Sequence, residues 1–239
     1  MLIGSYTDAG VVLTGGILGA ALSGHIPQRL KDGLPMMFGL ASMGMGVSLI
    51  VHGHAVAVMV LSLLLGVIIG ESCALETHLG AVSTWGNRLM GRFVPMPADL
   101  IPEVFLERFV ALTVLFCASG TGIFGAIHEG MTGDPSILLA KSVLDFLTAA
   151  IFATTLGFAV AAICIPQLAV LLALATGATY LAPLTTPLMN DNFAAVGGVL
   201  MLATGFRICG IVKFPVGNML PALVLAMPMT TIWLRFVGP

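Results

Sequence analysis

Charged residues are scarce in this chain of 239 residues. Nine lysines and arginines and eleven aspartates and glutamates make up only 8% of the sequence, whereas a soluble domain carries about 25%. Hydrophobic residues make up 58% of the chain, and its mean hydropathy is +1.08. A soluble core cannot bury so much apolar surface, but a lipid bilayer can. The composition therefore predicts an integral membrane protein with the lipid bilayer around it.

The sequence also lacks the features of several functional classes. Its net charge of −2 excludes a strongly basic surface, so we expect no nucleic-acid partner. It has no Walker loop, no dinucleotide fingerprint and no Gly-x-Ser-x-Gly motif, so we expect neither an enzyme nor a cofactor. The four cysteines form no Cys-x-x-Cys and are expected to be buried apolar thiols. His52, His54 and His128 lack tight metal-ligand spacing, so no metal site is expected.

Long apolar runs predict an all-α bundle of about eight transmembrane helices. A bilayer core of about 30 Å needs roughly 20 apolar residues in a helix. The predicted spans cover residues 3–23, 35–52, 55–74, 104–128, 136–158, 167–183, 193–211 and 217–236. The division between the fifth and sixth spans rests on the short sequence CIPQ, and a seven-span bundle follows if that division fails. We expect residues 1–239 to form a single transmembrane domain.

The segment between the third and fourth spans has a different pattern. In residues 75–93 apolar side chains recur every three or four positions, and Glu76, Arg88 and Arg92 lie between them. This spacing predicts an amphipathic helix, and Trp85 suits a membrane interface. We therefore expect this helix to lie on the membrane surface.

Basic residues are distributed unevenly between the two predicted sides. The outer side of an eight-span bundle holds Arg235 alone. The inner side holds five basic residues, which are Arg29, Lys31, Arg88, Arg92 and Lys213. Cytoplasmic loops carry the excess of lysine and arginine in membrane proteins. Both termini are therefore predicted to lie outside the cytoplasm.

Two parts of the chain resemble each other. Residues 32–66 align without a gap on residues 191–225 with five identical positions. A further overlay places residues 44–46 on residues 120–122, so that Thr121 and Thr204 share one position. With eight spans the last hairpin is inverted relative to the others, and inverted repeats are typical of secondary transporters. Chance similarity between glycine-rich helices is the alternative.

Two charged residues lie inside the fifth predicted span. Each such residue costs about 2.5–3.5 kcal/mol to insert, so it marks a functional candidate. Lys141 and Asp145 are one helical turn apart and pair on one face, with Ser142 beside them. The alternative is a structural ion pair that fixes this span to a neighbour.

The eighth span opens with Asn218 and Pro221, and Pro228 is expected to break it again. A proline frees a backbone carbonyl, and freed carbonyls with an amide suit an ion or a polar solute at membrane depth. Asp8 gives the first span a polar start, with a simple N-cap as the alternative. The predicted substrate- or ion-binding site near the bilayer midplane comprises Lys141, Ser142, Asp145, Asn218, Thr121, Thr204 and Asp8.

Six segments carry a family resemblance. They are GGILG, LSLLLGVIIGE, ERFVALTVLFCASG, GDPSILLAKSVLDF, AVGGVLMLATGF and VGNMLPALVLA, and they cover nearly the whole chain in order. In these segments the sequence resembles the YqgA/YdfK-type family of bacterial inner-membrane proteins of unknown function. The resemblance implies a multi-pass protein of the bacterial inner membrane, from a family often regarded as transporters. In that family an asparagine often stands at the position of Asp8.

Together these features predict a secondary carrier of a small solute or ion. A non-transporting membrane scaffold or sensor is one alternative, since the amphipathic helix offers a docking face. An ion channel is another, although the chain has few polar residues to line a pore. Small residues such as Gly15, Gly16 and Gly19 allow close helix contact, so we also expect a homodimer.

Overall fold

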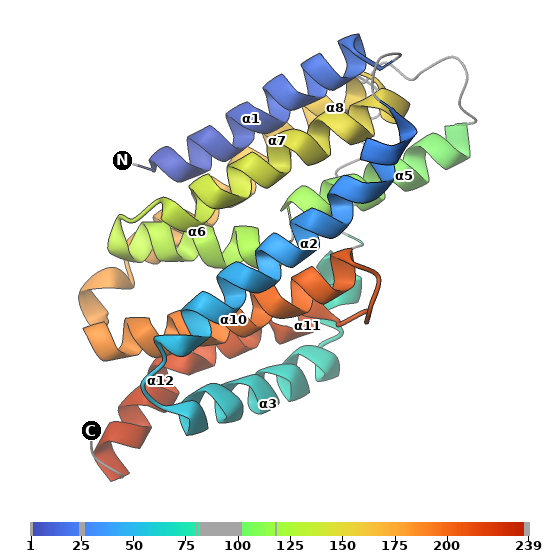
Figure 1. The fold of residues 1–239 in the computed structure, drawn as a ribbon. Helices are drawn as coiled ribbons and strands as arrows, with labels where there is room; N and C mark the ends of the chain where they lie inside the picture. Colours follow the sequence, from blue (N-terminus) through green and yellow to red (C-terminus); the bar gives the residue numbers. More distant parts are fainter. Residues whose placement is uncertain (1, 24–26, 80, 82–101, 118, 237–239) are drawn as a thin grey trace. The chain divides into compact units, whose positions relative to one another are not determined.

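The computed structural model describes residues 2–23, 27–79, 81, 102–117 and 119–236. Their secondary structure is helical, and no strand occurs in this part of the chain, which confirms the all-α fold class (Figure 1). The longer helices are α1 (Ile3–Ala21), α2 (Gln28–Val51), α3 (Val56–Ser72), α5 (Pro102–Cys117), α6 (Gly120–Thr132), α7 (Ser136–Leu156), α9 (Cys164–Thr179), α10 (Pro187–Ile208) and α12 (Pro221–Phe236). The short ones are α8 (Ala159–Ala162), η1 (Ala182–Leu184) and α11 (Val216–Met219).

Several of these helices have the length and composition of membrane spans. Among the described residues, three stretches are long and apolar enough to cross a bilayer, namely Ser136–Leu156, Ala159–Leu184 and Val216–Phe236. Met36–Val51 and Val56–Ser72 are shorter apolar helices. The helices thus support a membrane protein, and the count of eight spans stays a prediction.

The fourth predicted span consists of two helices rather than one. α5 ends at Cys117 and α6 begins at Gly120. Between them Ser119 is the N-cap of α6, because its hydroxyl accepts a hydrogen bond from the Gly122 N–H at 3.1 Å. A serine cap satisfies an N–H group that a new helix would otherwise leave free. The prediction of one continuous helix over residues 104–128 is therefore wrong at this point.

The fifth and sixth predicted spans separate at Gly157 rather than at CIPQ. Gly157 has a φ of 65°, a conformation that glycine adopts without steric cost. Pro166 lies in the first turn of α9, where its missing N–H breaks no helical bond. Pro228, which was expected to break the last span, lies inside α12, and that helix continues to Phe236. The loss of one backbone hydrogen bond is therefore not enough to end this helix.

The predicted amphipathic helix falls largely outside the described residues. Residues 75–79 and 81 are helical, as the pattern predicts. The rest of residues 75–93, including Trp85, lies outside the described part of the chain, so its surface location stays a prediction.

The chain divides into two compact units. The first comprises Met1–Pro35 and Leu79–Thr179, and the second comprises Met36–His78 and Tyr180–Pro239. The first unit therefore contains α1 and α5 to α9. The second contains α3, α10 to α12 and most of α2. The expectation of a single transmembrane domain stays a prediction.

In the first unit, glycines bring α1 and α7 into close parallel contact. Gly15 lies against the carbonyl of Phe146, and Gly19 lies against the backbone of Ala150. Residue numbers rise together along both helices, so the two run in the same direction. A Cβ atom at either glycine would collide with backbone atoms. Small residues of this kind permit close helix packing in a membrane.

In the second unit, α2 and α10 pack through glycines and run in opposite directions. Gly39 lies against Gly205, and Gly46 lies against Gly198. Higher numbers on α2 therefore meet lower numbers on α10, which makes the pair antiparallel.

The other helix pair of the second unit is also antiparallel. Gly66 of α3 lies against the backbone of Ala222 in α12, and Gly70 lies against the backbone of Asn218 in α11. The second unit is thus built from two hairpins, α2–α3 and α10–α12, whose matching helices run in opposite directions.

Candidate functional site

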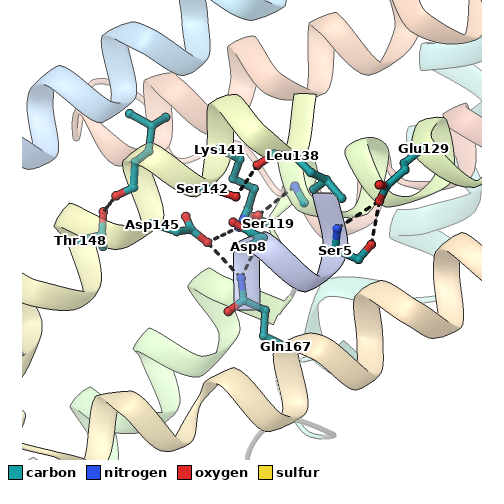
Figure 2. A network of polar contacts seen from close by, with 12 residues as sticks. Ser5, Asp8, Ser119, Glu129, Leu138, Lys141, Ser142, Asp145, Thr148 and Gln167 are labelled. Atoms are coloured by element: carbon teal, nitrogen blue, oxygen red, sulfur yellow. Dashed lines mark hydrogen bonds and ion pairs between the residues drawn. The ribbon is translucent and has the colours of Figure 1, made fainter. Parts of the chain in front are cut away.

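Lys141 and Asp145 form a buried ion pair on α7. The two residues are four positions apart, so their side chains lie on one face of the helix. Only 3% of Lys141 and 9% of Asp145 is exposed. Lys141 Nζ donates to Asp145 Oδ2 (Figure 2). The sequence pattern therefore placed this pair correctly on a buried face.

Asp8 of α1 joins this pair from the facing helix. Its Oδ2 atom accepts a hydrogen bond from Lys141 Nζ at 2.9 Å, and the residue is fully buried. Asp8 shares its face of α1 with Val12 and Gly15, one and two turns further on. The close packing of α1 on α7 thus brings Asp8 to the lysine.

Gln167 of α9 completes the cluster. Its amide Nε2 donates to Asp8 Oδ2 at 2.8 Å and to Asp145 Oδ2 at 3.0 Å (Figure 2). Carboxylates only accept hydrogen bonds when ionised, so the donor end of the amide must face them. Gln167 is fully buried. We call Asp8, Lys141, Asp145 and Gln167 the polar cluster.

The polar cluster is neither electrically balanced nor fully hydrogen-bonded. It contains two carboxylates and one ammonium, so its net formal charge is −1 when all three are ionised. In the described part of the chain, Asp8 Oδ1 and Gln167 Oε1 are buried without a hydrogen-bond partner. Buried acceptors that lack a partner cost about 1–3 kcal/mol each. The arrangement can therefore accept a hydrogen-bond donor or a positive charge.

A third buried carboxylate, Glu129 of α6, lies beside the start of α1. Its Oε1 accepts from the Gly4 N–H at 2.6 Å, and its Oε2 accepts from the N–H and hydroxyl of Ser5 at 3.1 and 2.9 Å (Figure 2). Only 1% of Glu129 is exposed. A carboxylate stabilises the first turn of a helix because free N–H groups and the helix dipole point toward it. Glu129, and not Asp8, therefore caps α1.

The other predicted site residues of the first unit are Ser142 and Thr121. Ser142 is buried, and its hydroxyl donates to the Leu138 carbonyl of its own helix at 2.8 Å. Thr121 is a buried residue of α6.

Thr204 and Asn218 belong to the second unit. The Thr204 hydroxyl donates to the Leu200 carbonyl at 2.8 Å. Asn218 lies in α11, and its Oδ1 accepts from the Glu76 N–H at 2.7 Å. Both side chains thus serve the backbone of this unit.

Two of the three histidines that could suggest a metal site, His54 and His128, lie beside separate aspartates. His54 Nε2 lies 3.2 Å from Asp191 Oδ2, and His128 Nε2 lies 3.9 Å from Asp134 Oδ2. Within the described residues, no three His, Cys, Asp or Glu side chains gather as metal ligands. All four cysteines are free thiols. The expectation that they are buried is wrong, because Cys73 is exposed and the other three are half-buried.

Gln167 and Glu129 were missed by sequence reasoning. Gln167 stands in CIPQ, which was interpreted as a break between spans, and a neutral amide adds no charge to an apolar run. Glu129 lies one residue beyond the predicted fourth span, residues 104–128, so it was not considered as a residue inside a helix. A Gln and a Glu one or two turns inside an apolar helix are the signals that would have identified both.

Known proteins resemble this chain over nearly all of its length. The model of a family described as "Protein of unknown function (DUF554)" matches residues 3–231. The "Uncharacterized protein YqgA" of Escherichia coli (strain K12) is 53% identical over 233 residues, which cover 98% of each chain. The "Uncharacterized membrane protein YdfK" of Bacillus subtilis (strain 168) is 26% identical over 234 residues, covering 94% of this chain and 93% of its own. No solved structure matches the chain.

Proposed function

Because this chain belongs to the DUF554 family of proteins of unknown function, we propose its function from its own geometry. It is a secondary carrier of a small solute or ion, and the polar cluster of the first unit is its binding site.

The surplus of acceptors in the polar cluster carries this proposal. A purely structural ion pair needs one carboxylate for Lys141, and Asp145 on the same helix already provides it. Asp8 adds a second buried carboxylate, and Gln167 adds a buried amide whose oxygen is free of partners in the described chain. Each charge costs about 2.5–3.5 kcal/mol in a membrane span, so surplus polar groups there indicate function.

The second unit supports an inverted repeat. Gly39 of α2 contacts Gly205 of α10, and Gly46 contacts Gly198. The overlay of residues 32–66 on residues 191–225 places Gly39 on Gly198 and Gly46 on Gly205. Exchange of the two copies therefore turns each of these contacts into the other. Secondary transporters are commonly built from inverted repeats.

One residue pair lies at the expected two-fold axis that relates the two copies of such a repeat. Ser42 and Met201 occupy the same position in the two copies, and the Ser42 hydroxyl donates to the Met201 carbonyl at 2.9 Å. The repeat is proposed for the hairpins α2–α3 and α10–α12 only. The third overlay would place Gly120, at the start of α6, on the middle of the continuous helix α2.

We further propose the bacterial inner membrane as the location, with both termini outside the cytoplasm and a homodimer as the assembly. Charge asymmetry between the loops supports the orientation, and the exposed apolar residues of the helices support contact with lipid or a second copy. Reporter fusions at each terminus test the orientation. Native mass spectrometry at several protein concentrations tests the dimer.

The carrier function is tested with Asp145→Asn. This change leaves Lys141 paired with Asp8, so the protein should still fold and insert. Asp191→Asn is the matched control, because Asp191 is half-exposed and lies in the other unit. Cells that produce wild type, variant or control at equal membrane levels are compared for intracellular metabolites and elements by mass spectrometry.

A carrier changes the level of at least one solute or ion in cells with the wild type and the control, but not in cells with Asp145→Asn. An unchanged profile in all three strains would favour a scaffold or sensor instead. An equal change in all three strains would show that the polar cluster is not the transport site.

A further inference from the structure

The two carboxylates of the polar cluster share the same two donors. Asp8 Oδ2 and Asp145 Oδ2 both accept from Lys141 Nζ and from Gln167 Nε2. Like charges so close together disfavour the state in which both are ionised. The lysine neutralises one of the two, and one negative charge remains.

Among the described residues, the elements packed around the cluster do not supply the missing positive charge. The ion pairs of the described residues give Asp8 and Asp145 no cation besides Lys141. Glu129 of α6 is a further acid, but its oxygens are occupied by the start of α1. α5 contributes the thiol of Cys117, and α8 contains only apolar residues.

A proton balances the remaining negative charge better than a metal ion does. One proton on the carboxylate pair removes the excess negative charge and needs no ring of oxygen ligands. Calcium and magnesium need about six or more oxygen ligands, whereas among the described residues the cluster has two fully buried oxygens without a partner, Asp8 Oδ1 and Gln167 Oε1. The Lys141 ammonium also occupies the position between the carboxylates where a second cation would bind most strongly.

We propose that the polar cluster binds one exchangeable proton on its Asp8–Asp145 carboxylate pair, and that this proton is the coupling ion of the carrier. The binding step is a carboxylate plus a proton giving a carboxylic acid, with no other change in bonds or electrons. With one proton bound, the cluster has no net charge. A neutral cluster suits a carrier that changes conformation while the cluster is closed off within the membrane. The coupling role rests on the carrier function proposed above, whereas the proton site itself does not.

Infrared spectroscopy of the purified full-length protein in detergent tests the proton site directly. A protonated carboxylic acid has a carbonyl stretch distinct from that of a carboxylate, and this band shifts in D₂O. We expect the wild type at neutral pH to show this band with the intensity of one carboxyl group. Asp8→Asn and Asp145→Asn should each lose it, because each leaves one carboxylate balanced by Lys141. Asp191→Asn, a carboxyl change in the second unit, should keep it.

Three results would overturn the proton site. The first is the absence of the band from the wild type at neutral pH. The second is a band that persists in both cluster variants, because another acid would then carry the proton. The third is loss of the wild-type band when NaCl replaces choline chloride at constant pH, because the site would then take Na⁺.

Coupling is tested separately in proteoliposomes that contain a pH-sensitive dye. An imposed solute gradient, using the compound identified in the cell comparison, should move protons with wild type and not with Asp8→Asn. Solute transport without proton movement would overturn the coupling but leave the carrier intact. A carboxylic acid band without any solute transport would overturn the carrier function and leave the proton site intact.

Discussion

The two units of this protein use buried polar residues in opposite ways. In the second unit, Asn192 and Asn218 cap chain segments at helix starts. Asn192 Oδ1 accepts from the N–H groups of His54 and Ala55 at 3.2 and 3.1 Å, and Asn218 Oδ1 accepts from the Glu76 N–H. In the first unit, the charged members of the polar cluster lie inside helices and satisfy no helix end. Capping therefore explains these two asparagines, as it explains Glu129 of the first unit, but it does not explain the polar cluster.

The ion pairs of the two units differ in charge balance and in exposure. Arg207 and Glu76 of the second unit pair one to one at 2.5 Å between Nη1 and Oε1, and their side chains are 45% and 31% exposed. Ser62 and Asn190 of this unit also have a buried oxygen without a partner among the described residues, but neither residue is charged. An excess charge without a partner is thus a feature of the polar cluster in the first unit. The comparison teaches that charge balance, rather than burial alone, separates a structural group from a functional candidate.

Removal of each unit's cation should give the largest contrast. Lys141→Met leaves two buried carboxylates without a positive partner, and breaking a buried pair costs about 3–5 kcal/mol. Arg207→Met breaks a partly exposed pair, which is worth about 0–1 kcal/mol. We expect Lys141→Met to reduce the membrane level strongly and Arg207→Met to change it little, as measured by quantitative immunoblots and thermal unfolding in detergent.

A triple variant serves as the control for this contrast. Lys141→Met combined with Asp8→Asn and Asp145→Asn removes all three charges and should restore the membrane level. Failure of the triple variant to recover would mean that the lysine stem, rather than its charge, is required for packing.

Glycine packing should be equally important in both units. Gly15 in the first unit and Gly46 in the second each face backbone atoms, so an alanine there overpacks the contact by about 1–3 kcal/mol. Gly10 and Gly44 have no atom within 4 Å of an added Cβ, and Gly→Ala there should be neutral or stabilising by up to about 1 kcal/mol. Thermal unfolding of the four alanine variants measures both effects.

The same variants sharpen the comparison between the units. Gly15→Ala should also weaken the carboxylic acid band, because it pushes the helix that carries Asp8 away from Lys141. Gly46→Ala should leave the band intact. Loss of the band in both variants would show that the two units do not act separately.

Local sequence patterns were enough to predict only the parts of the site that lie on one helix. Lys141 and Asp145 were found because a spacing of four places both on one face. Asp8 was found by its polarity alone, but its partner could not be named, since its contact with α7 depends on packing between helices far apart in sequence. Gln167 was missed for the same reason, and because its amide is neutral.

The fold shows the same division between local and distant information. The all-helical class followed from composition and apolar runs. The break at Ser119 was missed because a single serine cap interrupts an otherwise apolar run. Thr204 was assigned to the site because it shares a repeat position with Thr121, and Asn218 because it stands near Pro221. Each side chain forms a hydrogen bond with a backbone atom, and their place in the site stays a prediction.

Loss of an asparagine cap in the second unit should have a moderate effect on stability alone. Asn192→Leu and Asn218→Leu remove the acceptors for N–H groups at helix starts, which costs about 0.5–2 kcal/mol each. We expect a lower midpoint of thermal unfolding and an unchanged carboxylic acid band. A variant that loses the band while its unfolding midpoint stays at the wild-type value would contradict the structural role of these residues.

The smallest effect is expected at Asp134, an exposed carboxylate of the first unit. Its Oδ1 accepts from the Ser136 N–H and its Oδ2 from the Ser136 hydroxyl, each at 2.9 Å, at the start of α7. Asp134→Ala should lower the free energy of unfolding by about 0.5–1 kcal/mol at neutral pH. Asp134→Asn, which keeps one acceptor oxygen, should recover most of that loss. Asp134 belongs to the first unit but is exposed. A small effect here would therefore show that the large effects expected at the polar cluster come from burial and charge balance, and not from membership of the first unit.

The pH dependence at Asp134 follows from the same hydrogen bonds. The Ser136 N–H bond, more than any other contact, holds the pKa of Asp134 below its ordinary value of 3.8. A carboxyl whose pKa is lower in the folded state stabilises the protein above its unfolded pKa, and this contribution is lost as the pH falls through the folded value. The difference in unfolding midpoint between wild type and Asp134→Ala should therefore be constant at neutral pH and shrink below about pH 4. If the difference persisted in acid, the carboxylate would not be the group that matters. The Thr132 hydroxyl, which accepts from the Asp134 N–H at 3.1 Å, would then hold this loop in place.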